Sequence, residues 1–216
     1  MSWLARIFGT PASPDAATPV SRSAEAADAV DLAVDSARRW VRAGYYSREE
    51  IADWVADIAE DEGLDPYIFD ADGLVAREIA DLRAEQMHWP AVTEWDRLDA
   101  ALEALEMNGI VARQDFTCCG SCGMAEIDAE IDRFEARGVT ARGYVFFHQQ
   151  DTESAVDGQG LYFNYGGRDT GERSALRVGE ELVQALRRAG LKPKWNGDLG
   201  RRIFLPIDWK RRWTDG

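Results

Sequence analysis

The sequence predicts an α+β protein, in which a helical N-terminal region packs on a ferredoxin-like (βαββαβ) module with a small C-terminal hairpin. Two patterns predict this class. Apolar residues recur at helical spacing in four segments before residue 109, and short apolar strands alternate with amphipathic helices after it. We therefore expect three parts: a flexible leader (1–23), an acidic helical region (24–108) and the ferredoxin-like module with a cysteine-rich edge site (109–216).

The helical region shows clear start and stop signals. Ser47 and Glu50 form the pattern of a capping box, Thr93 is a second N-cap, and Asn108-Gly109 is a typical helix end. The leader before it is rich in Pro, Ser, Ala and Thr and has no apolar period, which is typical of flexible chain. Four helices are expected, near 24–42 (with Val30, Val34, Ala37 and Val41 inward), from Ser47, near 72–87, and from Thr93 to 107.

The second half alternates strands and helices. The link between the second and third strands is short and polar, so we expect a direct strand-to-strand connection there, which gives the split βαβ order. The expected strands are 110–116, 143–149 and 161–165, with a hairpin of 194–195 and 202–207 around Asn196-Gly197; the expected helices are 122–137, with Met124 facing inward, and 174–189.

The charge is unevenly distributed along the chain. The 23 acidic and 9 basic side chains of residues 1–109 account for the whole net charge of −14, whereas residues 110–216 carry 16 of each. An acidic half disfavours nucleic acid as the main partner, because phosphates repel it. No stretch is long and apolar enough for a transmembrane helix, and no export signal is recognisable, so we expect a cytoplasmic protein with reduced thiols.

All three cysteines lie in one short run, Phe116-Thr-Cys-Cys-Gly-Ser-Cys-Gly-Met124, between an expected strand and an expected helix. Helix N-termini stabilise thiolates, and the thiolate is the form that binds metal or attacks a disulfide. The run therefore indicates a site, but it does not name a reaction. Whether the protein is an enzyme is left open by this pattern.

The run Phe116-Thr-Cys-Cys-Gly-Ser-Cys-Gly123, with Gly143-Tyr-Val-Phe-Phe-His-Gln-Gln-Asp-Thr-Glu153 and Leu161-Tyr-Phe-Asn-Tyr-Gly166, resembles a bacterial domain-of-unknown-function family of uncharacterised proteins. The resemblance covers roughly the second half of the chain and implies no activity. It implies that the cysteine run and the His148 run belong to one module. The family carries a His where Met124 stands here, which weakens any proposal that needs a ligand at this position.

Topology brings these two runs together. If a returning helix joins the first two strands, both strands run in the same direction and their C-terminal ends share one edge of the sheet. The first strand ends at the cysteine run and the second at His148, so two polar clusters distant in sequence are expected at the same edge.

Three interpretations of this edge remain open. The first is a zinc site using Cys119, Cys122 and His148, with Asp151 or Cys118 as the fourth ligand; a single C-x-x-C pair gives it moderate specificity. The second is a thiol–disulfide redox site, with Cys119 as nucleophile and Cys122 as resolving thiol. The third is simple packing of small residues beside a glycine-rich turn, with Ser121 as the helix N-cap.

The remaining candidate residues give weaker evidence of a functional site. His88 is expected to cap or pack at a helix end. The basic and Trp-rich C-terminus has a composition typical of nucleic-acid binding. Its charge is equally complementary to the acidic helical half, so it could pack there, on this chain or on a second copy. The working hypothesis is a binding or regulatory module with a possible zinc; thiol redox activity and nucleic-acid binding through the tail are the alternatives.

Overall fold

The computed structural model describes residues 19–169 and 171–214. The first 18 residues of the expected leader lie outside this range. Residues 19–23 were expected to be flexible, but they form the beginning of the first helix, α1 (Pro19–Ala43). Proline is well suited to the first turn of a helix, because its missing N–H has no partner there in any case.

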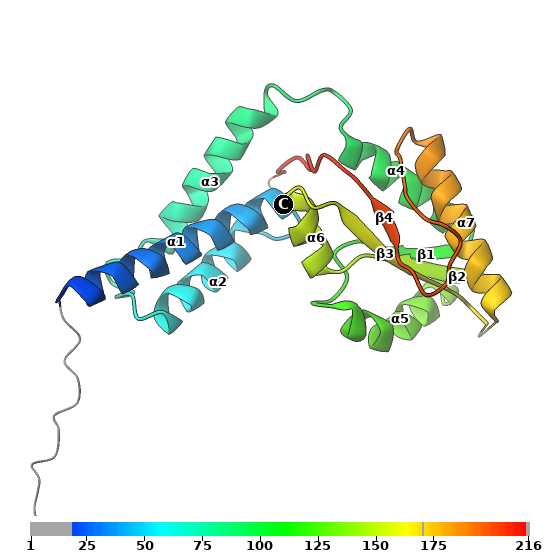
Figure 1. The fold of residues 1–216 in the computed structure, drawn as a ribbon, viewed down its shortest axis with the longest axis horizontal. Helices are drawn as coiled ribbons and strands as arrows, with labels where there is room; N and C mark the ends of the chain where they lie inside the picture. The colour runs from blue at the N-terminus through cyan, green and yellow to red at the C-terminus, as the bar shows by residue number, and fades with distance from the viewer. Residues whose placement is uncertain (1–18, 170, 215–216) are drawn as a thin grey trace, which may run out of the picture.

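Three helices form a unit of their own (Figure 1). α1 packs against α2 (Arg48–Asp61) and α3 (Ala71–Gln86) around a shared apolar core. The capping box of Ser47 and Glu50 is confirmed, and Ile51 and Val55 of α2 are buried. On α1, Ala37 and Val41 are buried as predicted, but in the first half of the helix Ala29 and Ala33 are buried, whereas Val30 is 38% exposed.

The fourth helix, α4 (Glu94–Met107), belongs to the core of the sheet. Its cap is Thr93, as predicted, and its buried residues Leu98, Leu102 and Leu105 pack with residues of the strands and of α7 (Glu172–Arg188). The division between the two apolar cores therefore falls before α4.

The α+β class is confirmed, with a four-stranded mixed sheet in the order β1-β2-β3-β4. The strands are β1 (Ile110–Arg113), β2 (Gly143–Phe146), β3 (Leu161–Gly167) and β4 (Ile203–Leu205). β1 and β2 are parallel, β3 is antiparallel to β2, and β4 is antiparallel to β3. Helix α5 (Gly120–Glu135) connects the two parallel strands.

The ferredoxin-like strand order is not formed. In a split βαβ arrangement a third strand lies between the two parallel strands, but here β1 and β2 are hydrogen-bonded directly. The expected short link between β2 and β3 instead contains a helix, α6 (Gln149–Val156), capped by His148. The unit β1–α5–β2 is therefore an ordinary crossover between neighbouring parallel strands.

The two faces of the sheet are covered unequally. Alternate strand residues, including Val145, Phe147 and Phe163, form one core with α4 and α7. Val111, Tyr144 and Phe146 point to the other face and pack with α5. α5 lies over β1 and β2, so that Tyr162 on the same face of β3 remains 42% exposed (Figure 1).

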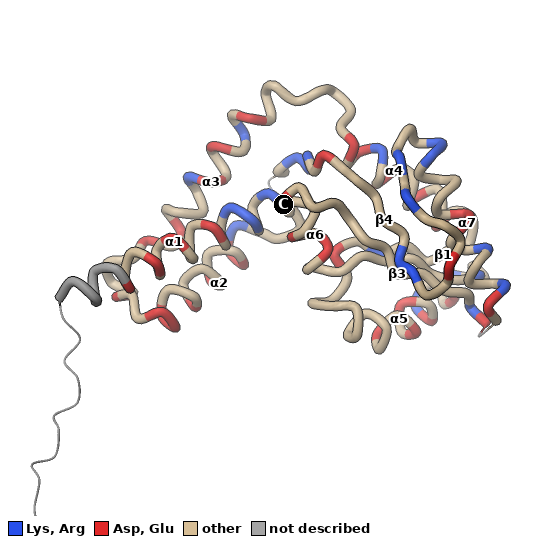
Figure 2. Tube along the Cα trace, viewed as in Figure 1, with Lys and Arg blue, Asp and Glu red and all other residues tan. Residues whose placement is uncertain are grey.

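The C-terminal hairpin is reduced to one bridge, in which Lys194 and Phe204 exchange two backbone hydrogen bonds. The following tail runs back to the helical unit, where the Trp209 indole donates to the Arg42 carbonyl at 3.1 Å. The Arg211 guanidinium lies 4.2 Å from the Tyr45 ring centre. Figure 2 shows acidic positions concentrated along α1 and α2 and basic positions on the tail and near β4. The tail's cations are thus used within the chain.

None of the helices in the described part of the chain combines the length and the apolar character that crossing a bilayer requires.

Candidate metal centre

The turn between β1 and α5 has an unusual backbone. Asp115 and Thr117 both adopt left-handed conformations, with φ of 51° and 58°. This region is unfavourable for L-residues, and least favourable for a β-branched residue such as threonine. Strained backbone of this kind persists only where surrounding contacts hold it, and it concentrates at functional sites.

Hydrogen bonds from the end of β2 hold this turn. The Phe116 N–H donates to the Phe147 carbonyl at 2.8 Å, and the Gln149 N–H donates to the Thr117 carbonyl at 3.1 Å. The Thr117 hydroxyl donates to the Cys119 carbonyl at 3.2 Å. The cysteine turn and the start of α6 therefore lie side by side, as the shared strand direction predicted.

The turn brings the three thiols together. The sulfur atoms of Cys118, Cys119 and Cys122 all lie within 4.8 Å of one another, and those of Cys118 and Cys122 are 3.3 Å apart. Cys119 is the N-cap of α5, in place of the expected Ser121, and its extended backbone starts the helix at Gly120. Cys118 is exposed and the other two are half-buried, so the group opens to solvent.

The three thiols differ in acidity. The pKa of Cys119 is lowered, because the Cys122 N–H, the Cys122 and Cys118 thiols and the Ser121 N–H donate towards its sulfur. The same sharing raises the pKa of Cys122 to about 12, since its proton is held between the sulfurs of Cys118 and Cys119. The Cys119 thiol therefore loses its proton more readily than an ordinary thiol, and the helix N-terminus stabilises the resulting thiolate.

His148 lies at the same edge, but its ring is engaged elsewhere. It caps α6: Nδ1 accepts from the Asp151 N–H at 3.3 Å, and Nε2 lies 3.1 Å from the Asp151 carboxylate. The Nδ1 lone pair is therefore occupied, and within the described residues neither ring nitrogen belongs to the group of metal-ligand atoms that the three cysteines form. Burial is the main cause of the lowered pKa of His148, which favours the neutral form.

Asp151 is also committed. Its carboxylate accepts hydrogen bonds from the Arg202 guanidinium and from the His148 N–H, and its side chain is 5% exposed. The structure therefore brings Cys118, Cys119 and Cys122 into one group and leaves the ligand atoms of His148 and Asp151 outside it. The cysteine group and the His148–Asp151 pair approach each other at Gly120, where an added Cβ would lie 3.6 Å from the His148 ring.

A second, partly buried network was not predicted. Asp115 accepts hydrogen bonds from the hydroxyls of Tyr46 at 2.5 Å and Thr152 at 2.6 Å. Burial raises the pKa of Asp115, and the two hydroxyl donors oppose that effect. The Asp115-to-Thr152 spacing carries no motif, and the partner Tyr46 comes from the loop between α1 and α2, so no local pattern could have revealed this network.

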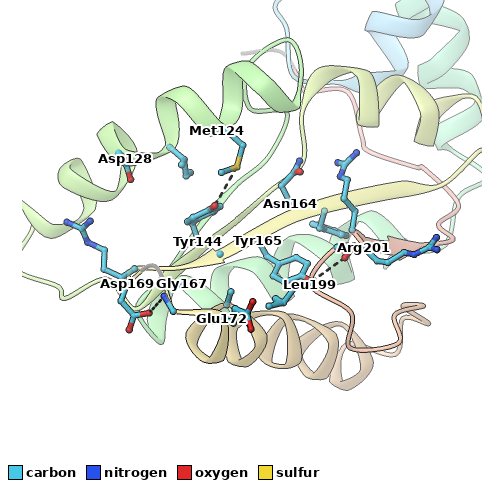
Figure 3. Close-up of a pocket in the computed structure, with 18 residues that line it drawn as sticks. Met124, Asp128, Tyr144, Asn164, Tyr165, Gly167, Asp169, Glu172, Leu199 and Arg201 are labelled. Carbon is cyan, nitrogen blue, oxygen red and sulfur yellow. Dashed lines mark hydrogen bonds between the residues drawn. The ribbon is translucent and has the colours of Figure 1, made fainter.

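A groove of about 530 Å³ opens beside this edge, between α5, β3 and the segment before β4 (Figure 3). Met124, predicted to be inward, is 51% exposed and forms one wall with Tyr144, whose hydroxyl donates to its sulfur at 3.5 Å. The Asn164 amide nitrogen in the lining is buried and, within the described residues, has no hydrogen-bond partner. The groove thus places polar side chains next to the first turn of α5.

His88 lies away from this edge. Its Nδ1 is 3.2 Å from the Ala84 carbonyl oxygen at the end of α3, which agrees with the capping role expected for it.

Comparison with known proteins gives a family but no activity. A family model described as a domain of unknown function (DUF6891) matches residues 26–213. No curated protein and no solved structure matches the chain.

Proposed function

Since the chain belongs to the DUF6891 family, whose description names no activity, we propose a function from its geometry: a metal-binding module that holds zinc with the thiolates of Cys118, Cys119 and Cys122. The observation that carries this proposal is the gathering of the sulfurs of all three cysteines within 4.8 Å at an exposed helix start. The binding or regulatory role expected from the sequence is then exerted through this edge.

The spacing of the sulfurs suits a tetrahedral ion. A Zn–S bond of about 2.3 Å places two sulfur ligands about 3.8 Å apart. The Cys118 and Cys122 sulfurs are 3.3 Å apart and all three lie within 4.8 Å, so small side-chain adjustments are sufficient. Thiolates are soft ligands, which favour zinc or copper(I) over magnesium and calcium.

Three protein ligands leave the fourth position open. Because both ring nitrogens of His148 are engaged with Asp151, water or a donor atom of a partner completes the shell in this proposal. The N–H groups at the start of α5 stabilise the negative charge of the thiolates. In a reducing cytoplasm, where this proposal places the protein, free thiols are available to the metal.

The test is elemental analysis of untagged protein purified under reducing conditions. We expect about one zinc per chain in the wild type and loss of zinc in Cys118→Ser, Cys119→Ser and Cys122→Ser. Ser121→Ala is the matched control, since its exposed side chain lies between the ligands, and it retains zinc. His148→Asn also retains zinc if the shell is as proposed. A wild-type protein without metal, also after reconstitution with zinc, contradicts the proposal.

The second candidate function is thiol–disulfide exchange, favoured by the lowered pKa of Cys119. The Cys119 thiolate attacks a substrate disulfide and expels one of its sulfurs as a thiolate, which forms a mixed disulfide. Cys122 then attacks this bond, gives up its proton and releases the second substrate thiol. Reduction of a model disulfide that depends on Cys119 and Cys122 in metal-free protein supports this candidate; equal activity in Cys119→Ser contradicts it.

A further inference from the structure

The cysteine turn is held by the helical unit as well as by the sheet. Two adjacent tyrosines in the loop between α1 and α2 reach it: the Tyr45 hydroxyl donates to the Gln114 side chain at 2.7 Å, and the Tyr46 hydroxyl donates to the Asp115 carboxylate at 2.5 Å. These residue pairs are each 69 positions apart in sequence. The contact joins the α1–α2 loop to the start of the turn that carries the thiols.

Asp115 is anchored from both sides. Tyr46 donates to one carboxylate oxygen, and the buried hydroxyl of Thr152 on α6 donates to the other at 2.6 Å. The residue itself is left-handed, with φ of 51°. A single short polar residue tolerates this conformation only when its side chain is held by local or tertiary contacts.

The conformation at Asp115 determines the direction of the chain into the cysteines. Only two residues separate Asp115 from Cys118, and the second of them, Thr117, is also left-handed. Its hydroxyl then bonds the Cys119 carbonyl at the start of α5. If Asp115 returned to the favoured right-handed or extended region, the Cα path through Thr117 would change and the three sulfurs would no longer converge.

We infer that Asp115, held by the Tyr46 and Thr152 hydroxyls, is a positioning residue for the cysteine group, so that metal affinity at the sheet edge depends on docking of the helical unit. The inference rests on the proposed metal-binding function. Three thiolates repel one another when no cation lies between them, so a turn that already gathers them removes part of the cost of binding. Asp115 touches no metal ligand and acts through the backbone.

The test compares variants of the full chain by zinc affinity, measured in competition with a chromophoric chelator below the unfolding range. Tyr46→Phe removes one donor, Thr152→Val removes the other, and Asp115→Ala removes both contacts. We expect each to weaken zinc binding about tenfold or more, because each lost hydrogen bond involves a charged group. Cobalt(II) spectra report whether the ligand geometry changes as well.

Two matched variants separate positioning from general destabilisation. Tyr165→Phe makes the same change at a hydroxyl that bonds the Asp198 and Arg201 carbonyls, away from the turn, and is expected to keep wild-type affinity. Asp115→Asn tolerates the left-handed backbone and can accept from one hydroxyl and donate to the other, so it is expected to restore binding to within about twofold of wild type.

The inference is overturned if folded Tyr46→Phe and Thr152→Val bind zinc as tightly as the wild type. If wild-type protein binds no metal, the proposed function fails by itself, and amide hydrogen exchange then decides the inference. Faster exchange of residues 116–122 in Tyr46→Phe than in Tyr165→Phe supports the positioning role, and equal exchange removes it. Tyr46→Phe and Thr152→Val keep the test valid if Asp115→Ala does not fold.

Discussion

Arg202 donates a hydrogen bond to the carboxylate of Asp151, which lies 51 positions earlier in the chain and is 5% exposed. The same guanidinium nitrogen donates to the Tyr162 carbonyl at 2.7 Å, and the group lies over the Tyr162 ring. A nearly buried carboxylate therefore depends on one cation, which also ties the segment before β4 to β3 and to the start of α6.

Replacing Arg202 by Met leaves the Asp151 carboxylate buried without its cation. We expect the free energy of unfolding to fall by about 3 kcal/mol, since loss of one partner of a buried pair costs far more than loss of a surface pair. Urea denaturation measures the change. The neighbouring Arg201→Met is the control: its side chain is 76% exposed and is expected to alter stability by less than about 0.5 kcal/mol. Equal effects of the two changes contradict the prediction.

Gly123 in the first turn of α5 has no room for a side chain. A Cβ there would lie 2.5 Å from the Phe146 ring, so Gly123→Ala forces α5 away from β2. We expect a loss of about 1–3 kcal/mol in thermal or urea unfolding and weaker zinc binding, because the helix start carries Cys119 and Cys122. Gly120→Ala, where the added Cβ meets His148 at 3.6 Å, is expected to be nearly neutral. Destabilisation by Gly120→Ala as large as that by Gly123→Ala speaks against this account.

Thiol labelling is expected to be selective and pH-dependent in metal-free, reduced protein. The lowered pKa of Cys119 keeps a thiolate fraction at pH values where an ordinary thiol is protonated, whereas Cys122, with a pKa of about 12, remains protonated through the neutral range. Iodoacetamide should therefore modify Cys119 first, and its rate should fall only when the pH drops below this lowered pKa. Peptide mass spectrometry follows both sites. The same reaction in denaturant is the control, and equal rates in the folded protein refute the prediction.

The C-terminal tail is expected to contribute stability through Arg211. Its guanidinium lies 4.2 Å from the Tyr45 ring centre and 4.8 Å from that of Trp95. Arg211→Ala removes this packing and should lower the free energy of unfolding by about 2 kcal/mol. Lys210→Ala is the control, because its ion pair is with Asp208, two positions earlier in the same tail, and should change stability by less than about 0.5 kcal/mol. An unchanged free energy of unfolding in Arg211→Ala would show that this stacking does not contribute to stability.

Local signals in the sequence predicted most helices and the cysteine group. The capping boxes at Ser47 and Thr93 fix helix starts through side-chain hydrogen bonds within four residues, which a sequence shows directly. Helix α6 was missed because its cap is His148, which is not among the usual N-cap residues, although Asp151 completes a capping box three positions later. The strand continuation predicted through Gln149 therefore ended too late.

Contacts between residues distant in the sequence were harder to predict. The shared strand edge followed from chain direction alone, and it correctly brought the cysteine run next to His148. Strand order depends on which edges pair, and alternation of apolar residues along a strand does not specify its neighbour. Two of the partners, Tyr46 of Asp115 and Arg202 of Asp151, come from segments 69 and 51 positions away, so no spacing pattern pointed to them.

The return of the tail to the helical unit has a consequence for the order of folding. Trp209 of the tail and Arg42 of the helical unit are 167 positions apart. During synthesis, the helical unit leaves the ribosome long before the C-terminal tail that contacts it. Contacts of such sequence separation form late, because closing a long loop costs entropy before any contact compensates it. The contacts of the tail with the helical unit therefore form only after the last segment of the nascent chain emerges, whereas the partners of Tyr45 and Tyr46 in the cysteine turn are synthesised earlier.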